Sequence, residues 1–427
     1  MSQPHPSTTP RNSPATVLFA SLIGTTIEFF DFYIYATAAV LVFPKLFFPA
    51  GDAAAAMLQS LATFAIAFFA RPVGSALFGH FGDRIGRKAT LVAALLTMGL
   101  STVLIGALPT YASIGTWAPA LLALCRFGQG LGLGGEWGGA VLLATENAPA
   151  GKRAWYGMFP QLGAPIGFFM SGSIFLLLSQ TLSDADFFSY GWRIPFLASS
   201  LLVVVGLYIR LKIHETPDFQ KVIERNERVQ VPALTVWREH RRVLLLGTLI
   251  AMATFVLFYL MTVFALSWGT TALKFSRKDF LIQQLFAVLF FGLTIPISAL
   301  WADRHGRRIT LIAVSAAIAV FGLSMAPLFG SGNSLLVSVF LSLGLGLMGM
   351  TYGPLGTILS ELFPPAVRYT GASLTFNLAG ILGASLAPYA ATWLATNYGL
   401  QYVGYYLSAA ALISLVALLL VKRETTH

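Results

Sequence analysis

The chain has 427 residues, of which 56% are hydrophobic and 10% are charged. A soluble domain carries about 25% charged residues, so this composition excludes a protein whose outer surface faces only water. The net charge of +10 could indicate a nucleic-acid partner, but the placement of the basic residues, described below, argues against one.

Twelve apolar stretches follow one another along the chain. Each is long enough to cross a hydrocarbon core of about 30 Å, which takes about 20 residues of helix. They must be helical because lipid cannot satisfy an unpaired backbone. The sequence therefore predicts an all-α membrane protein. The twelve expected transmembrane helices are 16–44, 57–80, 89–109, 118–145, 153–180, 191–212, 241–270, 279–301, 308–329, 333–360, 367–396 and 400–421.

The basic residues are distributed unevenly between the two sides of the expected membrane. Lys45, Lys274, Arg277 and Lys278 fall in loops on one side, whereas most other Lys and Arg lie on the opposite side. Cytoplasmic loops are rich in Lys and Arg, so this pattern predicts a multi-pass bacterial inner-membrane protein with both termini in the cytoplasm. The predicted organisation is a cytoplasmic tail (1–15), a six-helix bundle (16–212), a cytoplasmic linker (213–240), a second six-helix bundle (241–421) and a cytoplasmic tail (422–427).

Two charged motifs occur twice, in the same order, once in each half. The first motif, GHFGDRIGRK at 79–88, returns as ADRHGRR at 302–308. The second, ENAPAGKR at 146–153, returns as ELFPPAVR at 361–368. A paired recurrence of this kind indicates an internal duplication, as in transporters built from repeated helical bundles. We therefore expect two pseudo-symmetric six-helix bundles.

The loop at 79–88, between the second and third of twelve spans, resembles the signature loop of the major facilitator superfamily. Four further stretches are similar to the metabolite–proton symporter branch, which includes importers of 2-oxoglutarate, citrate, shikimate, proline and betaine. The resemblance implies a substrate site at the midplane between the bundles and proton-coupled alternating access. The four stretches are IEFFDFY (27–33), FARPVG (69–74), GEWGG (135–139) and GWRIPF (191–196).

The same resemblance implies that the repeated charged residues form a cytoplasmic latch that holds the outward-facing state. It groups Asp83 with Arg87, Glu146 and Arg153, and groups their repeats likewise in the second half. The alternative is that these charges only set the topology. The expected latch residues are Asp83, Arg84, Arg87, Glu146, Arg153, Asp303, Arg304, Arg307, Glu361 and Arg368.

Five ionisable residues lie inside the first-half spans: Glu28, Asp31, Arg71, Arg126 and Glu136. Each costs roughly 2.5–3.5 kcal/mol at the bilayer centre, so each is a functional candidate. Glu28 and Asp31 share a helix face, and paired carboxylates in a low dielectric can take up and release a proton. We predict proton coupling by Asp31, Glu28 or Glu136. Structural ion pairing with Arg71 or Arg126 remains the alternative.

The two arginines are also the expected substrate contacts, because a guanidinium grips a carboxylate in a forked geometry. Arg71 could instead be a fixed counter-ion. The other expected substrate contacts are uncharged, and interhelical hydrogen bonding is their alternative role. They are Tyr35 and Gln129 in the first half, and Tyr259 and Asn377 in the second.

We interpret the chain as a proton-driven importer of a small organic anion, monomeric, with no cofactor beyond H⁺ as the coupling ion. Its other partner is the lipid bilayer. Gly130–Gly135 matches the dinucleotide fingerprint, but no strand precedes it, so a nucleotide site is rejected. One alternative is a symporter of a zwitterionic osmolyte such as proline or betaine. A transport-dead sensor or a membrane enzyme belongs to a different class, and no cluster of metal-binding residues favours the enzyme.

Overall fold

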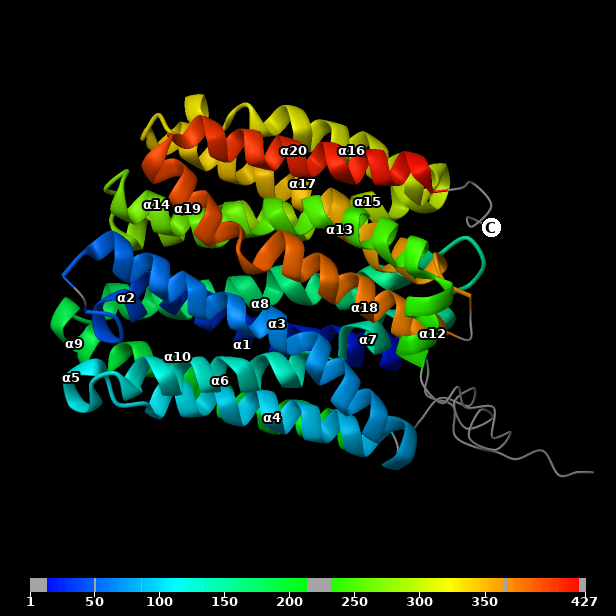
Figure 1. Cartoon of the computed structure of the whole chain (residues 1–427), viewed down its shortest axis with the longest axis horizontal. Coiled ribbons are helices and arrows are strands. Elements are labelled where there is room, and N and C mark those ends of the chain that lie inside the picture. The colour runs from blue at the N-terminus through cyan, green and yellow to red at the C-terminus, as the bar shows by residue number, and fades with distance from the viewer. Residues whose placement is uncertain are drawn as a thin grey trace, which may run out of the picture.

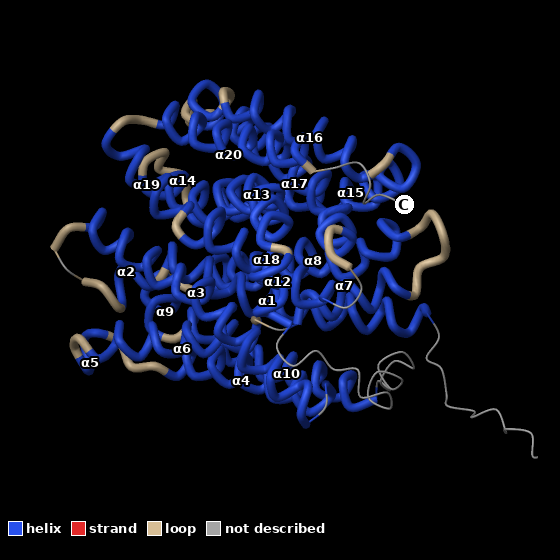
Figure 2. The backbone as a smooth tube through the Cα atoms, turned by 45° about the vertical axis from the view of Figure 1, so that its right-hand side comes forward, coloured by secondary structure: helices blue, strands red, loops and turns tan. Residues whose placement is uncertain are grey.

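The computed structural model describes residues 14–49, 51–85, 87–134, 136–212, 232–364 and 367–421. Within these ranges every regular element is a helix, and most helices run side by side along one direction (Figure 1). The predicted all-α class is therefore confirmed for the part of the chain that the structure describes. Figure 2 shows the same arrangement from a second direction.

The first half of the chain forms a bundle in which the long helices α1, α3, α4, α8 and α10 are joined by short connecting helices. The elements are α1 (Pro14–Leu41), α2 (Phe43–Leu46), α3 (Ala53–Ile85), α4 (Arg87–Ala107), α5 (Tyr111–Ile114), α6 (Trp117–Leu133), α7 (Glu136–Glu146), α8 (Arg153–Thr181), α9 (Asp184–Ser189), the 3₁₀ turn η1 (Gly191–Arg193) and α10 (Ile194–Lys212).

The second half repeats this plan, with three helices interrupted or extended by π-helical turns. The elements are α12 (Pro232–Glu239), α13 (Arg241–Tyr259), η2 (Leu260–Phe264), α14 (Ala265–Thr271), α15 (Arg277–His305), α16 (Arg307–Gly322), η3 (Met325–Phe329), α17 (Ser334–Glu361), α18 (Arg368–Gly380), η5 (Ile381–Ser385), α19 (Ala387–Asn397) and α20 (Leu400–Leu420).

Each of the twelve expected spans coincides with one of these helices or with two or three consecutive elements. Among the described residues, nine helices are long and apolar enough to cross a membrane by length and composition. The other three expected spans are α4, whose apolar stretch is shorter, the broken pair α6 and α7, and α16 with its extension η3. Breaks of this kind are tolerated in membrane helices where neighbouring helices satisfy the freed backbone groups.

The helix break at η2 shows how a neighbouring helix hydrogen-bonds the backbone groups that a break leaves free. A π-helical turn leaves carbonyl groups without their usual helical partners. The side-chain amide of Gln284 on α15 donates to the carbonyl oxygens of Met261 (3.2 Å) and Thr262 (2.7 Å) in this turn. Gln284 therefore stabilises the bend between α13 and α14.

The two halves meet along α8, which packs against α1 in its own half and against α15 and α17 of the other half. In Figure 1 the first half occupies the lower part of the view and the second half the upper part. We call the end with α7, α12 and the junction of α15 and α16 the motif end, because the repeated charged motifs lie there. The end with α2, α5, α9 and α14 is the opposite end.

Candidate functional site

The acid Asp31 of α1 points into the first half. It is only 1% exposed, and its Oδ1 accepts a hydrogen bond from the Ser199 hydroxyl of α10 at 2.5 Å. The Thr102 hydroxyl of α4, which donates to the Met98 carbonyl at 3.0 Å, lies near this carboxyl, while Oδ2 has no hydrogen-bond partner. Sequence reasoning missed Ser199 and Thr102, since an uncharged hydroxyl in an apolar span gives no signal of its own.

A line of polar side chains runs from Arg126 of α6 toward this acid. The Thr102 oxygen accepts a hydrogen bond from the Gln129 amide at 2.9 Å, and the Gln129 carbonyl accepts one from Arg126 at 3.0 Å. Arg126 Nε also donates to the backbone carbonyl of Phe64 at 3.3 Å. Arg126, Gln129 and Thr102 thus form a hydrogen-bonded line that ends near Asp31.

Arg126 is enclosed by aromatic rings of its own half. Its guanidinium carbon lies 4.1 Å from the ring centre of Tyr35, 4.5 Å from Phe32 and 4.9 Å from Phe64. The Tyr35 hydroxyl donates to Thr63 at 2.8 Å. Arg126 is 0% exposed, and cation–π contacts of this kind stabilise a desolvated charge. Arg126, Gln129 and Tyr35 therefore lie inside the first half.

Arg71 of α3 lies where the two halves meet. Its guanidinium carbon is 4.9 Å from the ring centres of both Phe32 and Phe68, and the second-half ring of Tyr259 is 5.5 Å from Phe68. Arg71 is 6% exposed, and its Nε has no hydrogen-bond partner. A Cβ on Gly134 would overlap the Arg71 carbonyl oxygen, so glycine lets α3 and the α6–α7 break approach this closely.

The acids Glu28 and Glu136 are buried but have different surroundings. Glu28 interacts electrostatically with Tyr33 of α1 and Tyr352 of α17, on the side that faces the second half. Glu136 is the first residue of α7, where a carboxylate suits the helix dipole. Although Glu28 is only three residues from Asp31, the two carboxyls meet different helices.

Asn377 of α18 makes hydrogen bonds across the junction of the halves. Its amide donates to the Ser75 hydroxyl at 3.1 Å and to the Gly134 carbonyl at 3.2 Å. Asn377 therefore makes interhelical hydrogen bonds, which is the alternative to its predicted role as a substrate contact.

A second connection between the halves involves Trp137, which is not among the predicted site residues. Its indole N–H donates to Gln161 of α8 at 3.0 Å, and Gln161 donates to the Tyr352 carbonyl at 3.0 Å. The Trp137 ring stacks on Phe376 of α18, with 3.7 Å between ring centres. The site between the halves is therefore packed mainly by aromatic and amide side chains.

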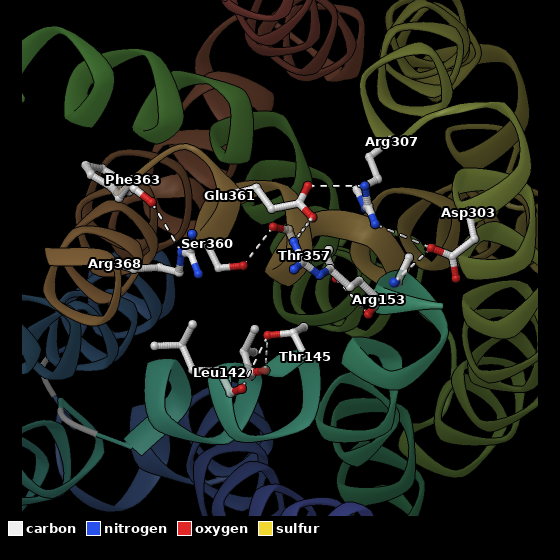
Figure 3. Close-up of polar contacts among 12 residues, drawn as sticks. Leu142, Thr145, Arg153, Asp303, Arg307, Thr357, Ser360, Glu361, Phe363 and Arg368 are labelled. Atoms are coloured by element: carbon white, nitrogen blue, oxygen red, sulfur yellow. Dashed lines mark hydrogen bonds and ion pairs between the residues drawn. The ribbon is translucent and has the colours of Figure 1, made fainter. Parts of the chain in front are cut away.

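Ion pairs join the halves at the motif end (Figure 3). Glu361, at the end of α17, lies 3.5 Å from Arg153 of α8 and 3.2 Å from Arg307 of α16. Neither carboxylate oxygen of Glu361 accepts a well-aligned hydrogen bond, so charge attraction dominates these contacts. The resemblance grouped Arg153 with first-half residues, whereas here it contacts the second half, because α8 begins directly beside the end of α17.

Asp303 at the end of α15 completes this contact. Its carboxylate oxygens accept backbone N–H groups of Ala154 (3.0 Å) and Trp155 (2.9 Å) in the first turn of α8, and it lies 3.6 Å from Arg307. An anion at a helix N-terminus satisfies free N–H groups and the helix dipole. A second-half carboxylate thus caps a first-half helix.

Between described side chains, the other predicted latch residues form no ion pair or hydrogen bond that joins the two halves. Arg368 donates to the carbonyl of Phe363 in its own half at 3.2 Å, and Arg304 is exposed. The side chains of Asp83, Arg84, Arg87 and Glu146 lie outside the described part of the structure.

Arg277 forms a comparable contact at the opposite end, which the sequence did not predict. From the start of α15 it donates to Ser179 of α8 at 2.8 Å and pairs with Asp184 of α9 at 3.0 Å. Its guanidinium carbon lies 3.9 Å from the ring centre of Phe187. Sequence analysis treated Arg277 only as a loop charge, since its partners are about 100 residues away in the chain. The halves are therefore joined at both ends.

The chain is similar to known transporters along nearly its whole length. Residues 16–231 match the family described as "Sugar (and other) transporter", and residues 281–427 match "Major Facilitator Superfamily". It is 61% identical to the inner membrane metabolite transport protein YhjE of Escherichia coli, over 98% of this chain and 96% of that protein. It is 36% identical to the shikimate transporter of the same organism (94% and 93%) and 32% identical to its proline/betaine transporter (93% and 81%).

Solved structures show a matching fold. The proton:xylose symporter XylE superposes with a TM-score of 0.74, over 94% of each chain, at 16% identity. At this identity the likeness concerns the fold alone, and it confirms the predicted arrangement of twelve transmembrane helices.

Proposed function

Because the chain belongs to the major facilitator superfamily and is a metabolite transporter rather than an enzyme, we propose that it is a proton-coupled symporter that imports a small organic acid by alternating access. The observation that supports this proposal best is that two buried ionisable side chains each keep a polar atom without a hydrogen-bond partner. Asp31 keeps one carboxylate oxygen without a partner, and Arg71 keeps its Nε without one. The first is suited to a proton and the second to a carboxylate.

We place the protein in the bacterial inner membrane with the motif end and both termini in the cytoplasm. The name of the 61% identical relative supports the inner-membrane location. The excess of Lys and Arg at the motif end supports the orientation. In this orientation the contacts of Glu361 and Asp303 close the cytoplasmic side, and those of Arg277 close the periplasmic side. Alternating access then requires each set of contacts to break in turn.

In the proposed cycle Asp31 carries the proton and the line through Thr102 and Gln129 links its charge to Arg126. The substrate carboxylate binds Arg71, whose guanidinium lies beside the Phe32 and Phe68 rings. Glu28 and Glu136 are the alternative proton sites. No cofactor beyond the proton takes part.

The test is uptake of labelled organic acids into proteoliposomes containing the purified protein. An inward proton gradient should drive accumulation above the external concentration, and a protonophore should abolish accumulation while leaving exchange intact. Accumulation that survives the protonophore, or that depends on sodium instead, contradicts proton symport.

A zwitterionic osmolyte is the second candidate substrate. The aromatic rings near Glu28 favour it, because rings with a nearby carboxylate can bind a quaternary ammonium group. Competition between glycine betaine and organic acids in the same vesicles separates the two candidates.

A further inference from the structure

The stretch GWRIPF (191–196) at the start of α10 has no part in the cycle proposed above. We propose that Arg193 in this stretch is a positioning residue for the proton site, because it fixes the end of α4 against the start of α10. Ser199 of α10 donates to Asp31, and the line of polar side chains from Arg126 ends at Thr102 of α4. This inference rests on the proposed function, in which Asp31 carries the proton.

The side chain of Arg193 reaches from the turn η1 to the end of α4. Its Nη1 donates to the backbone carbonyl oxygens of Gly106 (2.8 Å) and Leu108 (2.6 Å). Carbonyl groups at the end of a helix lack partners within the helix, and a cation there also suits the helix dipole. Arg193 therefore supplies donors to the end of α4 and ties that end to the start of α10.

The ring of Trp192 holds this guanidinium in place. The guanidinium carbon of Arg193 lies 4.5 Å from the centre of the Trp192 ring, within the range of a cation–π contact. Trp192 is buried, and the ring centres of Phe47 and Phe196 lie 5.8 Å and 6.2 Å from its own. Because close packing fixes the Trp192 ring, it also fixes the direction in which Arg193 points.

Two close contacts between α4 and α10 lie on either side of the two hydroxyl groups. At each contact a glycine of α4 leaves no room for a Cβ beside a side chain of α10. The pairs are Gly106 with Phe196 and Gly99 with Val203. In sequence, Thr102 lies between the two glycines and Ser199 lies between their two partners. A shift of either helix would therefore move one of these hydroxyls relative to Asp31.

The junction at Arg193 is close enough to control that position. Thr102 precedes Gly106 by four residues, and Ser199 follows Arg193 by six, which is about 6 Å and 9 Å along the helices. The Ser199–Asp31 hydrogen bond is 2.5 Å long. Hydrogen bonds between a hydroxyl and an oxygen span roughly 2.5–3.0 Å, so a displacement of about 1 Å would break this one.

The experiment records infrared difference spectra of the purified full-length protein in liposomes when the pH is stepped, with no substrate added. A carboxyl group that takes up a proton gains a C=O stretching band, whose frequency depends on the hydrogen bonds that the carbonyl oxygen accepts. Glu28 and Glu136 are also buried acids, so the Asp31 band is the one that disappears in Asp31→Asn. Ser199→Ala removes the hydroxyl donor and should move this band to higher frequency.

The Arg193 variants should reproduce that shift. Arg193→Ala should move the Asp31 band in the same direction as Ser199→Ala and at least about half as far, and the double variant should move it no further, because Arg193 acts through Ser199. Arg193→Lys keeps a cation at the end of α4 and should return the band toward its parental frequency. Gly106→Ala disturbs the same junction from α4 and should shift the band even if Arg193→Ala fails to fold.

Arg308 of α16 provides the matched control. It donates to the carbonyl oxygens of Leu418 (2.7 Å) and Leu419 (3.1 Å) at the end of α20, so it ties two helices of the second half as Arg193 ties two of the first. Arg308→Ala should lower the melting temperature by a similar amount and leave the Asp31 band in place.

The outcomes separate this inference from the proposed function. An Asp31 band at its parental frequency in Arg193→Ala and Gly106→Ala, or in Ser199→Ala, overturns the inference and leaves proton symport standing. An equal shift in Arg308→Ala would mean that any loss of stability moves the band, which also overturns it. If no band disappears in Asp31→Asn, Asp31 takes up no proton, and the proposed coupling fails together with the inference.

Discussion

Glu361→Gln should open the motif end, because this carboxylate lies between one arginine of each half. The substitution keeps the size of the side chain and removes its charge. Arg153 and Arg307 then lose the carboxylate they share, and among the described residues only Arg307 keeps a second acid, Asp303, at 3.6 Å. We expect the equilibrium to shift toward conformations in which the motif end is separated.

The size of this shift follows from the two ion pairs. At 3.2 Å and an effective dielectric constant of about 20, the Glu361–Arg307 attraction is roughly 5 kcal/mol before desolvation is subtracted. Desolvation of partly buried charges offsets most of that, and we take about 1.5 kcal/mol as the net value. The Arg153 side chain is 45% exposed, so its pair adds about 0.5 kcal/mol. The sum, about 2 kcal/mol, corresponds to roughly a 30-fold change in the open-to-closed ratio.

Distance measurements between spin labels provide the assay. Cys125 is replaced by alanine, and labels are attached at the exposed positions Ala150→Cys and His305→Cys, one in each half. Glu361→Gln should populate longer distances. Glu239→Gln, the same change at an exposed acid on α12, should not. A distance distribution that is identical in Glu361→Gln and its parent refutes the reasoning.

Four further outcomes are expected. Arg71→Lys should reduce substrate affinity by about tenfold or more despite keeping the charge, because the forked geometry is lost; unchanged calorimetric affinity would rule this out. Arg277→Gln should increase labelling of cysteines placed at the opposite end, since its contacts with α8 and α9 are lost, and equal labelling would argue against a closure there. Thr102→Val should slow proton-driven uptake while Thr102→Ser retains it, so equal uptake by the two variants would contradict a role for the hydroxyl. Gly134→Ala should destabilise the protein by about 1–3 kcal/mol by overpacking, whereas Gly24→Ala, which meets no atom within 4 Å, should not; a melting temperature that falls equally in both would exclude this cause.

The helical architecture could be predicted from the sequence because two physical constraints act on every span. Each span needs enough apolar residues to cross lipid, and Lys and Arg are concentrated in the connections on one side of the membrane. These constraints are local, so they are visible in a single sequence. The breaks inside spans, such as η2, depend on partners like Gln284 from another helix and were not visible.

The site was only partly predictable for the same reason. Charged residues inside spans, such as Asp31 and Arg71, are conspicuous because their cost in lipid is high. Their uncharged neighbours Thr102 and Ser199 are common in membrane helices and become recognisable only through contacts. Likewise, the repeated motifs indicated that Arg153 matters, but its contact with Glu361 depends on how the two halves dock.

The most direct test of the central claim is uphill uptake by Asp31→Asn in proteoliposomes. The neutral amide mimics the protonated acid, so we expect substrate binding and exchange to persist while accumulation driven by a pH gradient disappears. Asp52→Asn, at an exposed acid beside the start of α3, is the matched control and should accumulate substrate normally. If Asp31→Asn still accumulates substrate against its gradient, the proton is not carried by Asp31 and the proposed coupling is wrong.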